Sequence, residues 1–432
     1  MSEPLKIAVA GLGTVGAGLI DLLQKHADVL QSRCGRPLQV TAVSARDKAK
    51  DRGVNLSAYQ WFDDAVELAA KADADVVVEL IGGSEGVAKD MTEAAIAAGR
   101  NVVTANKALI AHHGTELAHA AEGAGVNLGY EAAVAGGIPI IKALREGLAG
   151  NGVSRVYGIL NGTCNYILTQ MRESGREFDD VLAEAQELGY AEADPSFDVD
   201  GVDAAHKLAI LASVAFGCEV NFEAVHVEGI RHISPLDIQF AEELGYKIKL
   251  LGVAALTNGH VEQRVHPCMV RKSAPIATVE GVFNAVVADG DFVDTVMQEG
   301  RGAGAGPTAS AVAADIIDIA RGSRIPTFAV PAADLKALPT LPMEKHRGAY
   351  YVRLMVLDQP GVFADVAAVL RDCAVSMEAV LQRGRAPGEP VPVVMTFHET
   401  EEASMTAALE KIAELDTVVE QPRMIRVETF GE

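Results

Sequence analysis

Basic residues are scarce in this chain relative to acidic ones, since 37 lysines and arginines stand against 59 aspartates and glutamates among 432 residues. The formal net charge of −22 would repel phosphate groups, which argues against nucleic acids and anionic membrane surfaces as partners. The sequence also lacks an apolar run long enough to cross a bilayer. Its first residues lack the basic segment, apolar segment and cleavage site of a secretion signal. We therefore expect a cytoplasmic protein.

Cysteines are also few, and they are scattered along the chain as Cys34, Cys164, Cys218, Cys268 and Cys373. Their number is odd, and no two of them have the pair spacing of a zinc site. We expect reduced thiols, as in a cytoplasmic protein.

What the first third of the sequence does contain is a regular alternation of short apolar runs with helical patterns. A chain of this length is expected to form two or three domains. The alternation predicts parallel β-α-β units with helices on both faces of a sheet. Strands are expected at 5–11, 38–45, 74–80, 100–105 and 126–132. Helices are expected at 14–25, 63–71, 86–99 and 111–123, and HADVLQSRCGRP (26–37) is expected to be a loop.

The remaining sequence predicts two further units after a first domain at 1–135. Residues 136–322 mix long helices with strands such as 153–160 and 249–256, which predicts an α+β domain. A proline-rich segment, 323–348, is expected to connect it to the last unit. Residues 349–432 show the order β-α-β-β-α-β, typical of a ferredoxin-like sandwich. Its elements are expected at 350–357, 363–373, 375–382, 391–398, 402–416 and 424–430.

A glycine-rich turn follows the first strand and opens the first helix. In it, Gly11 permits a tight turn, Gly13 lets the backbone approach a pyrophosphate, and Gly16 lets the helix and strand pack closely. The helix N-terminus attracts the anion. Strand, turn and helix agree with a dinucleotide-binding fingerprint. The predicted cofactor-binding turn comprises Gly11, Leu12, Gly13, Thr14, Val15 and Gly16.

Two other strand ends lie at the same predicted edge of the sheet. Arg46 follows the second strand and is suited to a 2′-phosphate, which predicts NADP. Asp47 is adjacent and would instead bind the ribose of NAD if the register differs by one residue. Ile81, Gly82 and Gly83 end the next strand and either line the nicotinamide side or form a simple turn.

The acidic stretch AEADPSFDVDGVDAAHKLAI (191–210) places five carboxylates ahead of a single lysine, Lys207. It is not a calcium loop, because with Gly201 at the sixth position the twelfth ligand would be Lys207 instead of glutamate. Asp203 and Lys207 are four residues apart on a predicted helix, so they are neighbours. A lysine held by a carboxylate can protonate a developing alkoxide, and the other acids can bind an ammonium group. A solvated acidic loop is the alternative. Lys107 follows a strand end and would face the cofactor crevice.

Several of these segments together resemble homoserine dehydrogenase, in its monofunctional bacterial form with a C-terminal ACT domain. The resemblance covers essentially the whole chain. Its most specific parts are GILNGTCNYIL (158–168) and LGYAEADPSFDVDGVDAAHKLAI (188–210). GLGTVG, TANKALI, EAAVAGGIPII (131–141) and RGAGAGPTASAVAADI (301–316) follow in the family's order. The implied reaction is the reversible NAD(P)-dependent interconversion of L-homoserine and L-aspartate 4-semialdehyde, in threonine and methionine synthesis.

The resemblance also implies roles for individual residues. Lys207 would be the proton donor with Asp203 as its partner. Lys107 would lie between cofactor and substrate and help to bind or protonate the substrate. Glu192 would bind the substrate amino group, in a wall that includes Gly189. The further implied contacts are Asp198, which would orient this constellation, and Gly304, which would approach the cofactor.

A monovalent cation, an effector and an oligomer are implied as well. The cation, Na⁺ or K⁺, would be bound by Glu131 and by the backbone of Val134, Gly136 and Ile138. Alternatively, Gly136 and Gly137 form only a tight turn between domains. The ACT domain would bind threonine near Gly361 as a feedback inhibitor, or would only mediate dimerisation, and a homodimer or homotetramer is expected.

Two competing hypotheses remain at this stage. One is another Rossmann dehydrogenase that acts on a different amino-acid aldehyde or 2-oxo acid. The other is a non-catalytic sensor of nucleotides and amino acids, although a sensor would not need Lys107 and Lys207.

Overall fold

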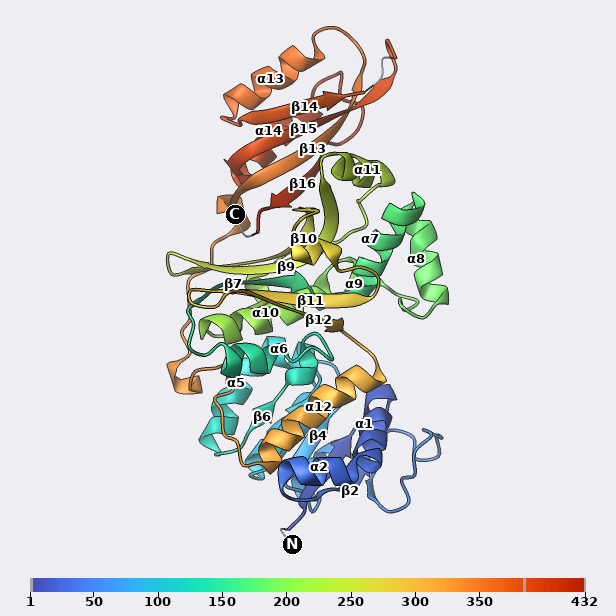
Figure 1. Ribbon diagram of the computed structural model, residues 1–432, viewed down its shortest axis with the longest axis vertical. Helices are drawn as coiled ribbons and strands as arrows, with labels where there is room; N and C mark the ends of the chain where they lie inside the picture. The colour runs from blue at the N-terminus through green and yellow to red at the C-terminus, as the bar shows by residue number, and fades with distance from the viewer. Residues whose placement is uncertain (1–2, 384–385, 431–432) are drawn as a thin grey trace.

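The computed structural model describes residues 3–383 and 386–430, which stack as three units along one long axis (Figure 1). The N-terminal unit lies at one end, a large sheet lies in the middle, and the C-terminal unit lies at the other end. No helix of the described residues is long and apolar enough to span a membrane. The arrangement places the cofactor-binding strand ends of the first unit against the middle unit.

The first unit contains a six-stranded parallel sheet in the order β3-β2-β1-β4-β5-β6. This order, with the switch point beside β1, is that of a Rossmann dinucleotide-binding fold and confirms the prediction. The strands are β1 Leu5–Ala10, β2 Leu38–Ser44, β3 Gln60–Phe62, β4 Val76–Glu79, β5 Asn101–Thr104 and β6 Leu128–Gly129. β6 is shorter than expected, because a 3₁₀ turn begins at Glu131. The short edge strand β3 was not predicted.

Helices cover both faces of this sheet, as expected. They are α1 Thr14–Lys25, α2 Ala27–Cys34, α3 Ala65–Lys71, α4 Val87–Ala97 and α5 Lys107–Gly123. The prediction of a loop at 26–37 was wrong, since most of it is α2, which ends at Gly35 in the left-handed conformation. α5 begins four residues earlier than expected. Its N-cap, Asn106, accepts the Leu109 N–H at 3.1 Å, which fixes Lys107 at the first turn.

One helix from late in the sequence returns to the first unit. α12, Ala305–Ala320, packs beside α1, and Gly18 allows the two backbones to approach at Ala305. Val312 and Ile316 share a buried cluster with Leu19. The segment 301–304 that leads into α12 therefore passes over the cofactor crevice.

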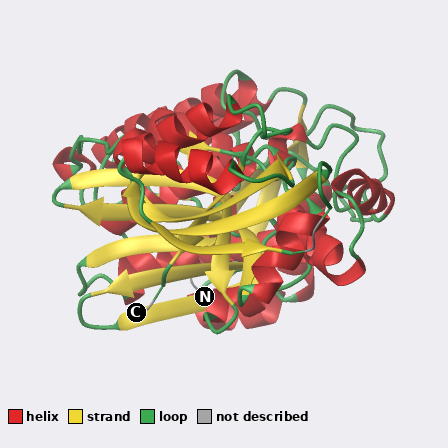
Figure 2. Ribbon diagram, turned by 90° about the horizontal axis from the view of Figure 1, so that it is seen from above, coloured by secondary structure: helices red, strands yellow, loops and turns green. Residues whose placement is uncertain are grey.

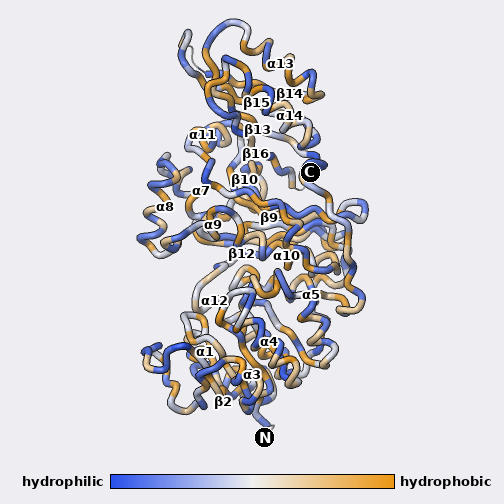
Figure 3. The backbone as a smooth tube through the Cα atoms, turned by 180° about the vertical axis from the view of Figure 1, so that it is seen from behind, coloured by the Kyte–Doolittle hydropathy of each residue, from blue (hydrophilic) through white to orange (hydrophobic). Residues whose placement is uncertain are grey.

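The middle unit is a sheet with α10, Val202–Phe216, packed on one face. Figure 2 shows the strands lying side by side with helices against them, and in Figure 3 hydrophobic residues run along inner strands such as β9. The strands are β7 Val153–Ile159, β8 His226–Val227, β9 Tyr246–Thr257, β10 His260–Arg271, β11 Phe283–Gly290 and β12 Asp294–Arg301. The other helices are α6 Ile140–Lys142, α7 Gly162–Ser174, α8 Phe178–Glu187, α9 Ser196–Val199 and α11 Pro235–Glu243.

The C-terminal unit has the predicted order of strands and helices. Its elements are β13 Arg347–Leu357, α13 Val362–Asp372, β14 Met377–Gln382, β15 Pro390–Glu401, α14 Glu402–Ala413 and β16 Arg423–Glu428. The strands lie in the order β16-β13-β15-β14, the arrangement of a ferredoxin-like sandwich. β16 also pairs with β10, in parallel, so one sheet runs through both units. Arg426 of β16 donates to Glu228 at 2.8 and 2.9 Å in this buried junction.

Candidate active site

A cavity of about 590 Å³ lies between the first unit and the middle unit. The first unit contributes the turn after β1, the start of α5 and the turn after β6. The middle unit contributes the starts of α7 and α10, the loop before α9, and the segment 301–304. Among the predicted site residues, Lys107, Lys207, Asp203, Glu192, Asp198, Gly189, Val15, Gly136 and Gly304 line it. The structure therefore brings together residues that are up to about 290 positions apart in the sequence.

The glycine-rich turn has the geometry that a pyrophosphate requires. Gly11 has φ +94°, and a Cβ there would lie 2.3 Å from the Leu80 carbonyl oxygen. A Cβ at Gly16 would lie 2.0 Å from the Gly11 carbonyl oxygen, so helix and turn are in close contact. Gly13, in contrast, faces open space, which leaves room for an anion at the N-terminus of α1. The residues of this turn fit a dinucleotide.

The turn after β4 is held by a buried carboxylate that the sequence analysis missed. Glu79, fully buried, accepts the backbone N–H groups of Ile81 and Gly82 at 2.7 and 3.0 Å. Thr104, at the end of β5, donates to its other oxygen at 2.5 Å. Ile81 and Gly82 thus follow β4 at the carboxyl edge of the sheet, in a turn that neighbouring strands fix, and they are not among the residues that line the 590 Å³ cavity.

Three cationic side chains gather after β2, near the place expected for the adenosine ribose. Arg46 is exposed, and Lys48 and Arg52 lie over the Trp61 ring at 5.7 and 5.8 Å from its centroid. Arg52 also donates to the Leu12 carbonyl oxygen at 3.1 Å, which ties this loop to the glycine-rich turn. Sequence reasoning identified Arg46 alone.

Asp47, the alternative ribose ligand, has a local role in the structure. Its Oδ1 accepts the Ala49 backbone N–H at 2.8 Å, as in an Asx turn. This turn leads from Asp47 into the segment that carries Lys48 and Arg52.

Two lysines converge on one carboxylate in the centre of the cavity. Lys207 Nζ lies 2.6 Å from Asp203 Oδ2, and Lys107 Nζ lies 2.9 Å from Asp203 Oδ1. Lys207 Nζ also donates to the Leu160 carbonyl oxygen at 2.7 Å. Burial alone would raise the pKa of Asp203, but the two ammonium groups hold it well below its usual range. Asp203 is therefore a permanent carboxylate that orients both lysines.

Asn161 completes this arrangement and was not singled out from the sequence. Its Nδ2 donates to Asp203 at 2.8 Å and to Asp198 at 2.7 Å, while its Oδ1 caps α7 by accepting the Cys164 N–H at 2.8 Å. Burial raises the pKa of Asp198, the second carboxylate of the group. The signal that was available is the position of Asn161 inside the most specific motif, GILNGTCNYIL, where it directly precedes α7.

Glu192 and Gly189 also line the cavity, from the loop between α8 and α9. Glu192 is exposed to the cavity, and Gly189 has φ +74°. Thr163, at the start of α7, donates to the Tyr190 carbonyl oxygen at 2.7 Å and holds this loop. One wall of the cavity therefore carries a free carboxylate suited to an ammonium group.

Gly304 and the region of Glu131 flank the cofactor side. Gly304 has φ +117° and precedes α12, at the N-terminus of a long helix. Glu131 is buried, and its two carboxylate oxygens accept the backbone N–H groups of Ile141 and Lys142, each at 2.9 Å. Burial and the nearby Asp315 raise its pKa to about 7. No cluster of three or more histidine, cysteine, aspartate or glutamate side chains suited to a metal occurs in the described part of the chain.

A buried histidine next to Lys207 gives a prediction for the pH dependence of stability. His206 stacks on Phe222 at 4.3 Å, and its Nε2 lies 3.3 Å from that of His112. Burial, His112 and Lys107 lower its pKa from 6.5 to about 4. Between these values the unfolded chain binds a proton that the folded chain does not, so stability falls as the pH falls. The difference between the two pKa values corresponds to a loss of roughly 3 kcal/mol in the free energy of unfolding.

Between pH 6.5 and about 4, we expect the free energy of unfolding to fall less in His206→Phe than in the wild-type protein. Urea denaturation at a series of pH values measures this. The control is His260→Phe, since His260 is exposed at the start of β10. An equally steep profile in the His206 variant would show that another group titrates.

Sequence comparisons identify two known families within the chain. The family described as "Homoserine dehydrogenase, NAD binding domain" matches residues 11–131. The family described as "Homoserine dehydrogenase" matches residues 139–317. The two matches cover the cofactor crevice, the α7–α10 region and most of α12.

Whole-chain relatives agree with these matches. The homoserine dehydrogenase of Neisseria gonorrhoeae is 46% identical over 436 residues, covering 100% of both chains. A crystal structure of a homoserine dehydrogenase from Thiobacillus denitrificans superimposes with a TM-score of 0.93, at 44% identity over 99% of each chain. A hyperthermophilic archaeal homoserine dehydrogenase in complex with NADPH, 28% identical, matches 75% of this chain and 99% of its own with a TM-score of 0.65.

Proposed function

Because the chain belongs to the homoserine dehydrogenase family, we propose that its 590 Å³ cavity interconverts L-homoserine and L-aspartate 4-semialdehyde with an NAD(P) cofactor. The observation that carries this assignment is the Lys107–Asp203–Lys207 cluster, which opens onto the cofactor crevice. A bound nicotinamide supplies or accepts the hydride.

The residues of the chain supply binding and proton transfer. Glu192 binds the substrate ammonium group, and Asp198 orients the cluster through Asn161. Lys207 donates a proton to the aldehyde oxygen as negative charge develops there, because its ammonium is already held against the cavity by Asp203. Lys107 stabilises the same oxygen and contacts the substrate. In the reverse direction Lys207 accepts the hydroxyl proton.

Absorbance at the nicotinamide band tests the reaction directly. The purified protein with NADP⁺ and L-homoserine is expected to produce NADPH, whereas serine and malate are expected to produce none. Reduction with serine or malate instead would identify a different dehydrogenase. Folded protein that binds NADPH but oxidises no substrate would favour a sensor without catalytic activity.

We further propose a preference for NADP over NAD, supported by Arg46 and its cationic neighbours Lys48 and Arg52. Arg46→Ala removes one cation that would pair with the 2′-phosphate. It is expected to raise the Kd of NADP⁺ about tenfold and to leave that of NAD⁺ nearly unchanged. Titration with both cofactors measures the difference. An equal loss for both cofactors would show that Arg46 does not bind the 2′-phosphate.

The cation site is proposed at Glu131 with carbonyl oxygens of Val134, Gly136 and Ile138. In support, Gly136 has φ +51° and lines the cavity, so this turn lies beside the cofactor side of the site. Initial rates in NaCl, KCl and a large organic cation at equal ionic strength test it. Equal rates in all three salts would show that the reaction needs no bound monovalent cation.

For the C-terminal unit we propose an ACT-type effector function, with threonine as feedback inhibitor. A cavity of about 390 Å³ lies at the β13–α13 turn, where it is lined by Gln359, Pro360 and Gly361, and Gly361 has φ +104°. Threonine is expected to lower the initial rate of the full chain and to raise its melting temperature. No effect on either would leave the unit with a structural or assembly role.

Deleting this unit is not a clean test of that role. β16 pairs with β10, and Arg353 of β13 donates to the buried Asp237 at 2.7 and 3.1 Å. Removing 349–432 would leave Asp237 and Glu228 without their guanidinium partners and is expected to destabilise the middle unit. A homodimer or homotetramer is also proposed, since ACT-type modules pair, and light scattering of the full chain measures it.

A further inference from the structure

One wall of the active-site cavity is the segment 279–284, which is fixed from behind by α7. Asn165 Nδ2 donates to three carbonyl oxygens of this segment, those of Val279 at 3.3 Å, Gly281 at 3.0 Å and Phe283 at 3.2 Å. A single side chain therefore determines the path of the backbone as it enters β11.

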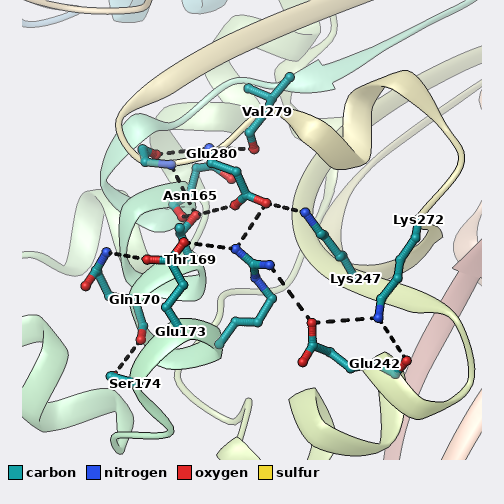
Figure 4. A network of polar contacts seen from close by, with 12 residues as sticks. Asn165, Thr169, Gln170, Glu173, Ser174, Glu242, Lys247, Lys272, Val279 and Glu280 are labelled. Carbon is teal, nitrogen blue, oxygen red and sulfur yellow. Dashed lines mark hydrogen bonds and ion pairs between the residues drawn. The ribbon is translucent and has the colours of Figure 1, made fainter.

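Charged side chains reinforce the same segment. Lys249, buried in β9, bonds to Asn165 Oδ1 at 3.0 Å and to Glu280 Oε2 at 3.1 Å. Thr169 donates to the same Glu280 oxygen at 2.9 Å, and Lys247 pairs with its other oxygen. Figure 4 shows Asn165 and Thr169 from α7 and Lys247 from β9 converging on Val279 and Glu280. The wall is therefore rigid.

The polar residue that this wall presents to the cavity, beside Val282, is Asn284. It is 1% exposed and lines the cavity with its side chain packed on two glycines. A Cβ at Gly302 would lie 2.2 Å from Asn284 Nδ2, and one at Gly162 would lie 3.3 Å from Oδ1. Gly302 belongs to the segment that leads to Gly304 and α12, so Asn284 is at the junction of the substrate and cofactor sides.

Asn284 is also incompletely bonded. Within the described residues no donor reaches its Oδ1, although the atom is buried. A buried amide oxygen without a partner costs free energy, so such a group in a binding cavity indicates a contact that forms with the ligand.

The substrate and the nicotinamide cofactor differ in the hydrogen-bonding groups that they could offer to Asn284. A carboxylate cannot donate to an amide oxygen, and the substrate ammonium is matched by the carboxylates of Glu192 and Asp198, which also line the cavity. The nicotinamide ring carries a neutral carboxamide with both a donor and an acceptor, next to the carbon that exchanges the hydride. Asn284, which lies beside Gly162 and Gly302, would offer such a carboxamide both an acceptor and a donor.

We propose that Asn284 binds the nicotinamide carboxamide through paired amide hydrogen bonds and so sets the position of the ring relative to the substrate. This inference rests on the proposed function, and it adds a cofactor-positioning residue from the middle unit. The rigid segment 279–284 fixes the amide before the cofactor arrives, which lowers the entropic cost of orienting the ring.

The test compares NADP⁺ with its 3-acetylpyridine analogue, in which a methyl ketone replaces the carboxamide. Fluorescence titration of the full chain gives the Kd of each without turnover. The wild-type protein is expected to bind NADP⁺ about tenfold more tightly than the analogue, and Asn284→Ala is expected to bind both equally. The control is Asn151→Ala, because Asn151 Oδ1 is also buried and unbonded but does not line the cavity.

Each outcome supports or overturns the proposal. An unchanged NADP⁺ preference in Asn284→Ala, with or without a higher KM for homoserine, would overturn it. If the alanine variant does not fold, Asn284→Ser, which keeps a polar side chain without an amide, provides the same comparison. Wild-type protein that binds neither nucleotide would instead contradict the proposed function.

Discussion

Lys207→Ala is expected to lower kcat about 10³-fold, within the range that a positioned proton donor contributes, while the Kd of NADPH stays within about threefold. The reason is the geometry of the Lys207 ammonium, which is bonded to Asp203 and to the Leu160 carbonyl oxygen and faces the reacting end of the cavity. Stopped-flow or steady-state rates with saturating homoserine measure kcat, and fluorescence titration measures the Kd.

Lys207→Arg separates proton transfer from charge. The guanidinium retains the positive charge beside Asp203 but does not release a proton at neutral pH. We expect turnover in Lys207→Arg to be nearly as low as in Lys207→Ala. Near-normal turnover in either variant would remove Lys207 from the proton-transfer step.

Asp203→Asn is expected to have the second largest effect, on both rate and stability. The carboxylate is buried and faces two ammonium groups, so its loss leaves both cations without their partner and costs roughly 3–5 kcal/mol of folding stability. We expect kcat to fall about 10²-fold or more, because Lys207 loses both its orientation and its counterion.

Asp200→Asn is the matched control for this variant, three residues away in the same acidic stretch. Asp200 pairs with Arg231 at 2.5 Å, but both side chains are more than 40% exposed. An exposed pair of this kind contributes little, so rate and stability are expected to remain near wild type. Equal losses in the two variants would mean that the acidic stretch acts only through its total charge.

Much of the fold follows from sequence patterns that act locally. The glycine-rich turn, the β-α-β alternation and the β-α-β-β-α-β order each depend on residues close in the chain, and the structure contains all three. The pairing of β10 with β16 joins residues about 160 positions apart, as in Cys268 with Arg426, and no local pattern indicates it. No local pattern indicates the packing of α12 against α1 either.

The candidate site was predictable to a similar extent. Asp203 and Lys207 are one helical turn apart, so their contact follows from spacing alone. Lys107 joins them only through tertiary packing, and its place in the site came from its position after a strand and from the family resemblance. Glu79 and Asn284 were missed because isolated polar residues carry no distinctive spacing, and their roles depend on partners that the fold brings together. Asn161 was missed although it lies inside the most specific motif, because its contact with Asp203 depends on tertiary packing.

The central claim is that this cavity transfers a hydride between the nicotinamide and carbon 4 of homoserine, with Lys207 supplying the proton. The most direct measurement uses NADPH deuterated at the transferable position of C4, aspartate 4-semialdehyde and the full chain, with mass spectrometry of the product. The account predicts homoserine with a single deuterium on carbon 4 from the wild-type protein and almost none from Lys207→Ala. Unlabelled homoserine from the wild-type protein, or equal amounts of deuterated homoserine formed by both proteins in the same time, would contradict it.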